Sequence, residues 1–90
     1  MLHFLHINVE IKAKILWRLY RHRYIGGKHT DINNLKKGFP KDKHKLIEKA
    51  VDELIKEGLI LRKPTKYGLH VSINPKMIGE VREIIENWIG

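Results

Sequence analysis

The sequence predicts a small α+β domain, and a change in the spacing of its apolar residues supports this fold class. Within residues 8–23, 32–37 and 41–57, apolar residues recur at three- and four-residue steps, the period of an α-helix. After Gly58 they alternate with polar residues, the period of a β-strand. A helical period returns after Asn74-Pro75. The chain has 90 residues, of which 42% are hydrophobic, which suits one domain spanning 1–90.

Residues that favour helix ends delimit four expected helices. Asn8, Asp31 and Asn74 are expected N-caps, because their side chains can accept the free backbone N–H groups of a first helical turn. Gly58 stands where a left-handed C-terminal cap belongs. The expected helices span about 8–23, 32–37, 41–57 and 75–89, with a short extended piece at 28–30 before the second.

A basic β-hairpin is expected at about 59–73. Its strands are predicted at 59–63 and 69–73, joined by a loop at 64–68 that is rich in turn-forming residues. Arg62, Lys63, Lys66 and Tyr67 lie on or beside this loop, and the hairpin contains no acid. These residues favour contact with a polyanion.

The order of these elements resembles the winged helix-turn-helix family, in its small archaeal and bacterial form. The resemblance covers about residues 9–75. It is most specific at 51–62, Val-Asp-Glu-Leu-Ile-Lys-Glu-Gly-Leu-Ile-Leu-Arg, which is similar to the family's junction between the recognition helix and the wing. The same scaffold serves DNA, RNA and protein binding, so the resemblance predicts the fold more strongly than the partner. The added last helix is similar to those that members use for packing or dimerisation.

The net charge of +8 is unevenly distributed along the chain. Residues 12–45 contain eleven Lys and Arg and two acids, whereas residues 46–90 contain seven of each sign. A surface that only needed solubility would mix its charges more evenly. A block of one sign predicts a footprint for nucleic-acid phosphates.

The expected third helix has its cations first and its acids later, which opposes the helix macrodipole. In the family that it resembles, this end of the recognition helix enters the major groove. We therefore expect recognition by Lys41, Lys43, His44, Lys45 and Lys49, with Lys45 or His44 discriminating between bases. Phosphate and wing contacts are expected from Lys28, Lys36, Lys37, Arg62, Lys63, Lys66 and Tyr67.

Several of these residues have a plainer interpretation. The first turn of the third helix could be merely a solvated charged turn, and Tyr67 could shield the backbone of its own loop. Arg18 or Lys14 could reach phosphates or could pair with the acids of the last helix, Glu80, Glu83 and Glu86.

No catalytic, metal or cofactor site is expected. His3 and His6 have H-x-x-H spacing, but no cysteine or clustered acid supports them as zinc ligands. No nucleophile stands beside a base, and residues 26–30 lack the spacing of a phosphate-binding loop. The absence of cysteine favours a cytoplasmic location, and the expected DNA binding implies association with the nucleoid. No apolar run is long enough to span a membrane.

The sequence thus predicts a double-stranded DNA-binding protein without enzymatic activity or an evident small-molecule effector, either a transcriptional regulator or a small chromatin-associated protein. The alternatives are a protein-interaction module and an RNA-binding winged helix. A homodimer is expected through Ile78, Val81, Ile85 and Trp88 of the last helix, with Trp17 and Tyr20 of the first helix as further candidates. The last helix could instead fold wholly onto its own domain.

Overall fold

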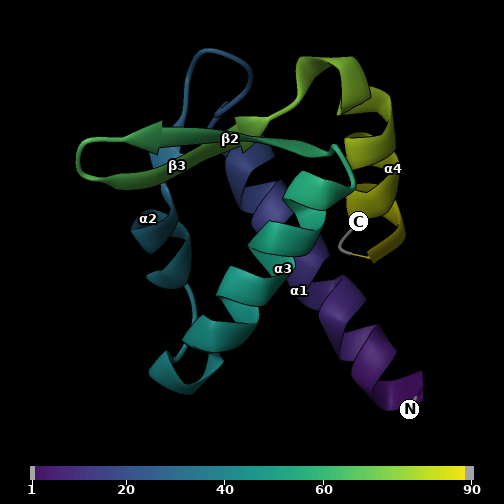
Figure 1. The fold of residues 1–90 in the computed structure, drawn as a ribbon. Helices are drawn as coiled ribbons and strands as arrows, with labels where there is room; N and C mark the ends of the chain where they lie inside the picture. Colours follow the sequence, from purple (N-terminus) through teal and green to yellow (C-terminus); the bar gives the residue numbers. More distant parts are fainter. Residues whose placement is uncertain (1, 89–90) are drawn as a thin grey trace.

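Four helices and a small antiparallel sheet form the protein, so the α+β class is confirmed (Figure 1). The computed structural model describes the backbone of residues 2–88 and the side chains of residues 9–88. The elements follow the predicted order. They are α1 (Leu2–Arg21), β1 (Thr30–Asp31), α2 (Ile32–Lys36), the 3-10 turn η1 (Lys41–Lys43), α3 (His44–Lys56), β2 (Ile60–Thr65), β3 (Gly68–Ile73), the 3-10 turn η2 (Pro75–Met77) and α4 (Ile78–Trp88).

Two of the three expected N-caps are confirmed. The Asp31 carboxylate accepts a hydrogen bond from the backbone N–H of Asn33 at 2.9 Å, and the Asn74 side chain accepts one from Lys76 at 3.1 Å. Asn8 is not an N-cap, because α1 already begins at Leu2. Residues 2–7 contain neither Gly nor Pro, so nothing stops the helix from extending past Asn8 toward the N-terminus. The last expected helical residue, 89, lies outside the described residues.

The hairpin is longer and its loop tighter than predicted. β2 continues to Thr65 and β3 begins at Gly68, so the connection is Lys66-Tyr67 instead of 64–68. The Thr65 hydroxyl donates to the Gly68 carbonyl at 2.8 Å and accepts from the Tyr67 N–H at 3.2 Å. Gly68 has φ 134°, a value that L side chains rarely adopt. Thr65 and Gly68 together close the loop within two residues.

β3 is the central strand of the sheet, whose order is β1-β3-β2. Val71 pairs with Thr30 on one side and with Arg62 on the other, and His70 pairs with Asp31 and Lys63 in the same way. The turn of the hairpin projects beyond the helices on the side of α2 (Figure 1). The sheet therefore connects the start of α2 to the base of the hairpin.

One apolar cluster joins α1, α3, α4 and the sheet. Leu16 and Leu19 of α1, Leu54 of α3 and Ile73 of β3 are fully buried in it, and Val81 extends it into α4. Replacing a fully buried leucine with alanine typically costs about 2–5 kcal/mol. This cluster fixes α3 and the hairpin relative to each other.

Candidate nucleic-acid interface

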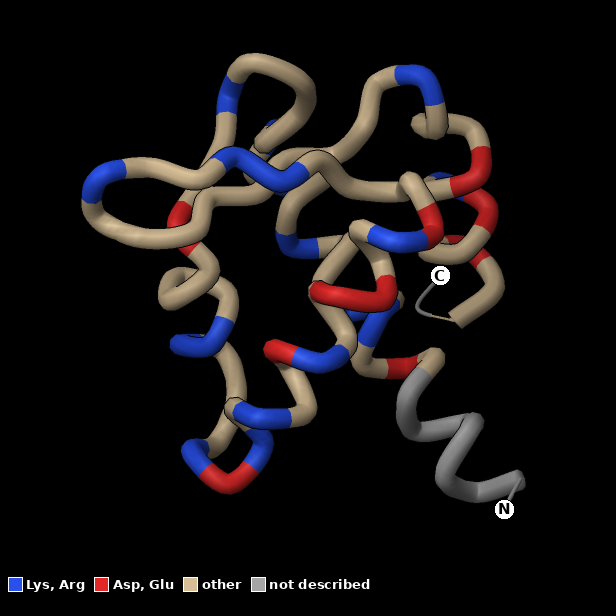
Figure 2. The backbone as a smooth tube through the Cα atoms, in the orientation of Figure 1, with Lys and Arg blue, Asp and Glu red and all other residues tan. Residues whose placement is uncertain are grey.

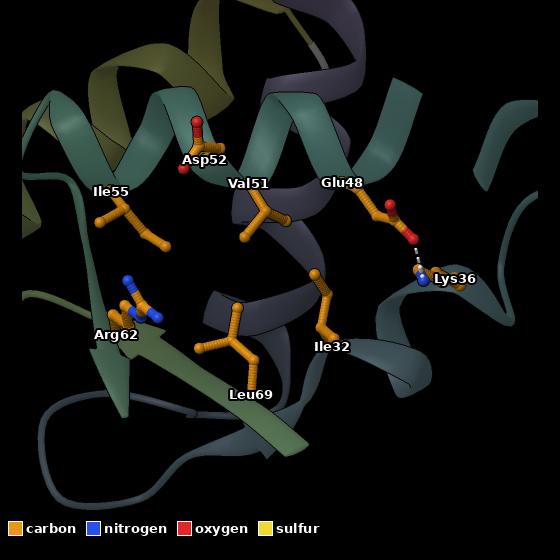
Figure 3. Close-up of a pocket in the computed structure, with 8 residues that line it drawn as sticks. All are labelled: Ile32, Lys36, Glu48, Val51, Asp52, Ile55, Arg62 and Leu69. Carbon is orange, nitrogen blue, oxygen red and sulfur yellow. Dashed lines mark hydrogen bonds and ion pairs between the residues drawn. The ribbon is translucent and has the colours of Figure 1, made fainter. Parts of the chain in front are cut away.

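A cleft of about 380 Å³ lies between α2, α3 and the hairpin (Figure 3). Its apolar lining comes from all these elements, and its charged residues come from α2, α3 and β2. The lining consists of Ile32, Lys36, Glu48, Val51, Asp52, Ile55, Arg62 and Leu69. Residues of α3 and residues of the hairpin therefore border one surface.

The acids of α3 and its C-terminal cap are each ion-paired with a lysine. Glu48 pairs with Lys36 of α2, and Asp52 pairs with Lys56 at 3.2 Å. Glu53 and Glu57 both pair with Lys12 of α1, at 2.9 and 3.0 Å. The hydrogen bond from Lys36 is the main cause that lowers the pKa of Glu48, and the positive charges of Lys36, Lys45 and His44 add to it. The negative charge of α3 is thus largely compensated within the protein.

Lys12 is the cation that links α1 to α3. Burial opposes its charged form, but hydrogen bonds from its ammonium to Glu53 and Glu57 outweigh burial and raise the pKa of Lys12. Only 13% of its side chain is exposed, so it is a structural cation. Lys36, expected to contact phosphate, is similarly engaged with Glu48, and 17% of its side chain is exposed.

Most other predicted contact residues lie open on the surface. Lys37, Lys41, Lys45, Lys63 and Lys66 are exposed, and none forms an ion pair with a described acid. Figure 2 shows lysine and arginine along the hairpin and around η1. Lys43 is half-buried on η1, and Lys49 is exposed on α3. Lys28 is exposed, with its ammonium 5.5 Å from the centre of the Tyr24 ring.

Tyr67, His44 and Arg62 are placed differently from one another. Tyr67 is 87% exposed at the hairpin turn, so its ring does not shield the backbone of its own loop. His44 is half-buried, and its Nε2 lies 3.3 Å from the carbonyl oxygen of Phe39, which anchors the ring to the turn before α3. The Arg62 guanidinium points into the cleft toward α3 (Figure 3). Lys45, which is exposed, is therefore the more accessible of the two residues expected to discriminate between bases.

Arg18 and Lys14 do not pair with the acids of α4, and contact of either residue with phosphate stays a prediction. Arg18 packs against Gly38, where an added Cβ would collide with its Nη1. Lys14 pairs with Glu10 of its own helix at 3.4 Å. Within residues 9–88, neither forms an ion pair with Glu80, Glu83 or Glu86. The spacing of apolar residues could not predict the contacts of Arg18 and Lys14, because it does not show which loop packs beside a helix.

The residues expected at a dimer interface are only partly accessible. Val81 is fully buried and Ile85 is 8% exposed, and both belong to the core of the chain itself. α4 packs along α1 (Figure 1). Much of the apolar stripe of α4 is therefore buried within the chain itself and is not available to a second copy. Ile78 is half-buried and Trp88 is 36% exposed. The homodimer stays a prediction, with Trp88 the most accessible of its four residues.

A pair of histidines, one just before β1 and one on β3, was not anticipated from the sequence. The Nδ1 atoms of His29 and His70 lie 2.9 Å apart, and His70 Nε2 lies 3.8 Å from an Asp31 carboxylate oxygen. Burial, then the positive charge of Lys63 and the proximity of His70, lower the pKa of His29. Only the pairing of β1 with β3 brings these rings together, and a two-residue strand leaves almost no periodic signal.

The described residues contain no group of three or more His, Cys, Asp or Glu that could hold a metal ion. The side chains of His3 and His6 lie outside the described residues. None of the helices in the described part of the chain is long and apolar enough to cross a bilayer. Comparisons of the chain with models of protein families, with curated proteins and with solved structures find no match.

Proposed function

We propose that the protein is a winged helix-turn-helix domain that binds double-stranded DNA, as a transcriptional regulator or a small chromatin-associated protein. One observation carries this proposal. The start of α3 and the hairpin present exposed lysines without acid partners, while the acids of α3 are each held by a lysine of the protein itself. In this arrangement η1 and the first turn of α3 enter the major groove and the hairpin follows the backbone.

Lysine contacts to phosphate supply the affinity in this proposal. Lys63 and Lys66 on the hairpin and Lys37 and Lys41 beside α3 neutralise phosphates and release counterions. Lys45, exposed on the first turn of α3, approaches base edges, where a lysine donates to guanine acceptors. Sequence discrimination then depends on α3, and the hairpin contributes affinity to every sequence.

A duplex of DNA is favoured over one of RNA because of groove shape. The major groove of B-form DNA admits an α-helix, whereas that of A-form RNA is too deep and narrow. The exposed lysines of η1 and α3 can therefore reach base edges in the major groove of DNA and not in that of duplex RNA.

A protein-interaction module is the second candidate, and the cleft between α2, α3 and the hairpin favours it. Ile32, Val51, Ile55 and Leu69 line this cleft, and apolar side chains of a partner peptide fit such a lining. Binding of a peptide there depends weakly on salt, whereas binding through several phosphates depends on salt steeply.

The test is a competition for the wild-type protein between a pool of 25-base-pair DNA duplexes and an RNA stem of equal length. The proposal predicts that the DNA pool is preferred and that Lys63→Gln with Lys66→Gln weakens binding to it. The matched control is Lys76→Gln, an exposed lysine on η2, at the opposite end of the hairpin from its turn. Equal binding to RNA, or an equal loss in the control, contradicts the proposal.

A further inference from the structure

The exposed side of α1 forms a second cationic surface. It is separate from the lysines of α3 and the hairpin, and it adjoins the proposed duplex surface at Lys37, which lines one of its hollows. Three adjoining hollows follow it, and no Asp or Glu lines any of them. Four of the chain's five arginines line these hollows: Arg18, Arg21, Arg23 and Arg82. We call these four residues, with Trp17 and Tyr20, the arginine–aromatic strip.

The largest hollow, of about 650 Å³, lies between α1 and the turn at residues 38–40. Trp17, Arg18 and Arg21 line it from α1, and Phe39 lines it from the turn. Arg18 also lines the neighbouring hollow toward α2, where Lys37 and Asn34 lie. α2 separates this hollow from the cleft beside α3, because Lys36 faces the cleft while Lys37 lines the hollow.

Gly38 makes room for the Arg18 guanidinium. A Cβ at this position would meet Nη1 of Arg18, so any larger residue displaces the end of that side chain. Arg18 is half-buried, and no acid among the described residues pairs with it. The guanidinium is therefore held at the wall of two hollows with its positive charge uncompensated.

Trp17 separates the large hollow from a third one, toward α4. Its side chain is 38% exposed, and its ring stacks with that of Tyr20 at a centroid distance of 6.5 Å and an interplanar angle of 23°. Arg82 of α4 donates from Nε to the Tyr20 hydroxyl at 3.0 Å. An exposed aromatic face thus has guanidinium groups on both sides.

The backbone of Arg23 has an unusual conformation for a residue with a side chain. It has φ 60°, and it occupies the left-handed position of a helix C-terminal motif, in which Tyr24 N–H bonds Leu19 O at 2.9 Å and Arg23 N–H bonds Tyr20 O at 3.0 Å. Glycine is the usual residue there, because a side chain costs about 1–2 kcal/mol in this conformation. Arg23 lines the third hollow. A strained arginine on a cationic surface indicates a use for its charge.

We infer that the arginine–aromatic strip binds a segment of single-stranded nucleic acid. A base stacks on Trp17, and the arginines take the phosphates on either side. Guanidinium groups suit this ligand better than ammonium groups, because they bind phosphate through two parallel hydrogen bonds and also stack on planar rings. Aromatic faces within a cationic groove are the usual means of holding unpaired bases. The inference does not depend on duplex binding by α3.

A second copy of the chain is a poorer occupant of the strip. Two-fold pairing would place the same patch on both sides of the interface. The hollows contribute arginine and lysine and no acid, so this pairing would set cations against cations. Nucleic acid supplies the missing negative charge and the planar groups together.

The fluorescence of Trp17 reports binding directly. In a Trp88→Phe parent, Trp17 is the remaining tryptophan, and a base stacked on it should quench its emission. The experiment titrates this parent with a 15-nucleotide oligo(dT) and with a 15-base-pair duplex. Arg18→Gln with Arg21→Gln tests the strip, and Lys63→Gln with Lys66→Gln on the hairpin is the matched control.

We expect oligo(dT) to quench Trp17 and the strip variant to bind it about tenfold more weakly, while the hairpin variant keeps parental affinity. Duplex binding should show the opposite pattern. Circular dichroism of each variant checks that the fold persists. Absence of quenching overturns the inference, and so does an equal loss of oligo(dT) binding in the hairpin variant. The inference is also overturned if the Trp17 emission shifts to the blue on anionic vesicles and does not respond to oligo(dT). The same holds if the emission shifts only when the protein associates with itself. Failure of duplex binding alone leaves this inference standing and refutes only the proposed function.

Discussion

The ammonium of Lys36 on α2 is ion-paired with the carboxylate of Glu48 on α3, across the cleft that faces the hairpin. The two residues are twelve positions apart, and the contact engages a lysine that was expected to bind phosphate with the first acid of α3, whose side chain stays exposed. This pair makes α3 less acidic than its composition indicates.

Replacing Glu48 by Gln should increase duplex affinity. The change removes a negative charge from the interface and frees Lys36 to contact phosphate. Two unit charges about 4 Å apart in water interact by about 1 kcal/mol, so we expect a gain of about fivefold at low salt. Fluorescence anisotropy of a labelled duplex measures it. Glu57→Gln is the control, because its partner is Lys12 of α1, and a gain of the same size there would argue against the assigned surface.

Lys45→Ala and His44→Ala should have different consequences. Lys45 is exposed on the first turn of α3, so its loss should relax sequence preference and cost about 1–3 kcal/mol on the best site. His44 contacts the Phe39 carbonyl, so its loss should lower the free energy of unfolding and leave the selected motif intact. Selection from a random duplex pool and urea unfolding separate the two effects. A motif unchanged in Lys45→Ala would refute its assigned role.

Arg23→Gly should stabilise the fold and weaken single-strand binding. Relief of the left-handed strain exceeds the extra unfolded-state entropy of glycine, for a net gain of about 0.5–1 kcal/mol. The control is Arg21→Gly, in the last turn of α1, which should lose about 1 kcal/mol because glycine disfavours a helix. Urea unfolding of both variants measures the difference. If Arg23→Gly is less stable than wild type, the arginine is a structural cap.

The His29–His70 pair should make stability depend on pH. The pKa of His29 is lower in the folded protein than in the unfolded chain, so below about pH 6.5 the unfolded state binds more protons. The stabilisation is therefore present above that pH and is lost as pH falls through the folded pKa. When the pH is lowered from 7.5 to 5, the free energy of unfolding should therefore fall less in His29→Gln than in the wild type. The same change at exposed His22 is the control, and equal slopes for wild type and His29→Gln would contradict the assignment.

A homodimer through α4 now depends mainly on Trp88, because Val81 and Ile85 are buried in the chain's own core. If the dimer forms, Trp88→Glu should yield folded monomers with weaker duplex affinity, since a charge would be buried at the interface. Analytical ultracentrifugation at tens of micromolar gives the assembly state. A wild type that sediments as a monomer, both free and on DNA, would refute the dimer.

The order of the elements could be predicted because each depends on local signals. The caps at Asp31 and Asn74 and the change of period after Gly58 lie within a few residues of the structures that they determine. The ion pairs could not be predicted in the same way. Lys12 is 45 positions from Glu57, and only the packing of α1 against α3 brings them together.

The sequence did not predict which side chains of α1 are exposed at the candidate sites, because this depends on how the helix is oriented against the rest of the fold. Its apolar residues cover a wide arc, so their spacing does not decide whether Trp17 faces the core or the solvent. The structure buries Ile15, Leu16 and Leu19 and leaves Trp17 exposed beside Arg21. The arginine–aromatic strip exists because the turn containing Gly38 packs beside this helix, which no periodic pattern records.

Duplex binding by the lysines of α3 and the hairpin is the central claim, and the salt dependence of duplex affinity tests it most directly. Each phosphate contact contributes about −0.9 to the slope of log affinity against log salt, so the four lysines assigned to phosphate predict a slope of about −3.6. Lys63→Gln with Lys66→Gln should reduce this slope by about two units, and Lys76→Gln should leave it unchanged. A wild-type slope near zero, or the same slope in all three proteins, would contradict the account.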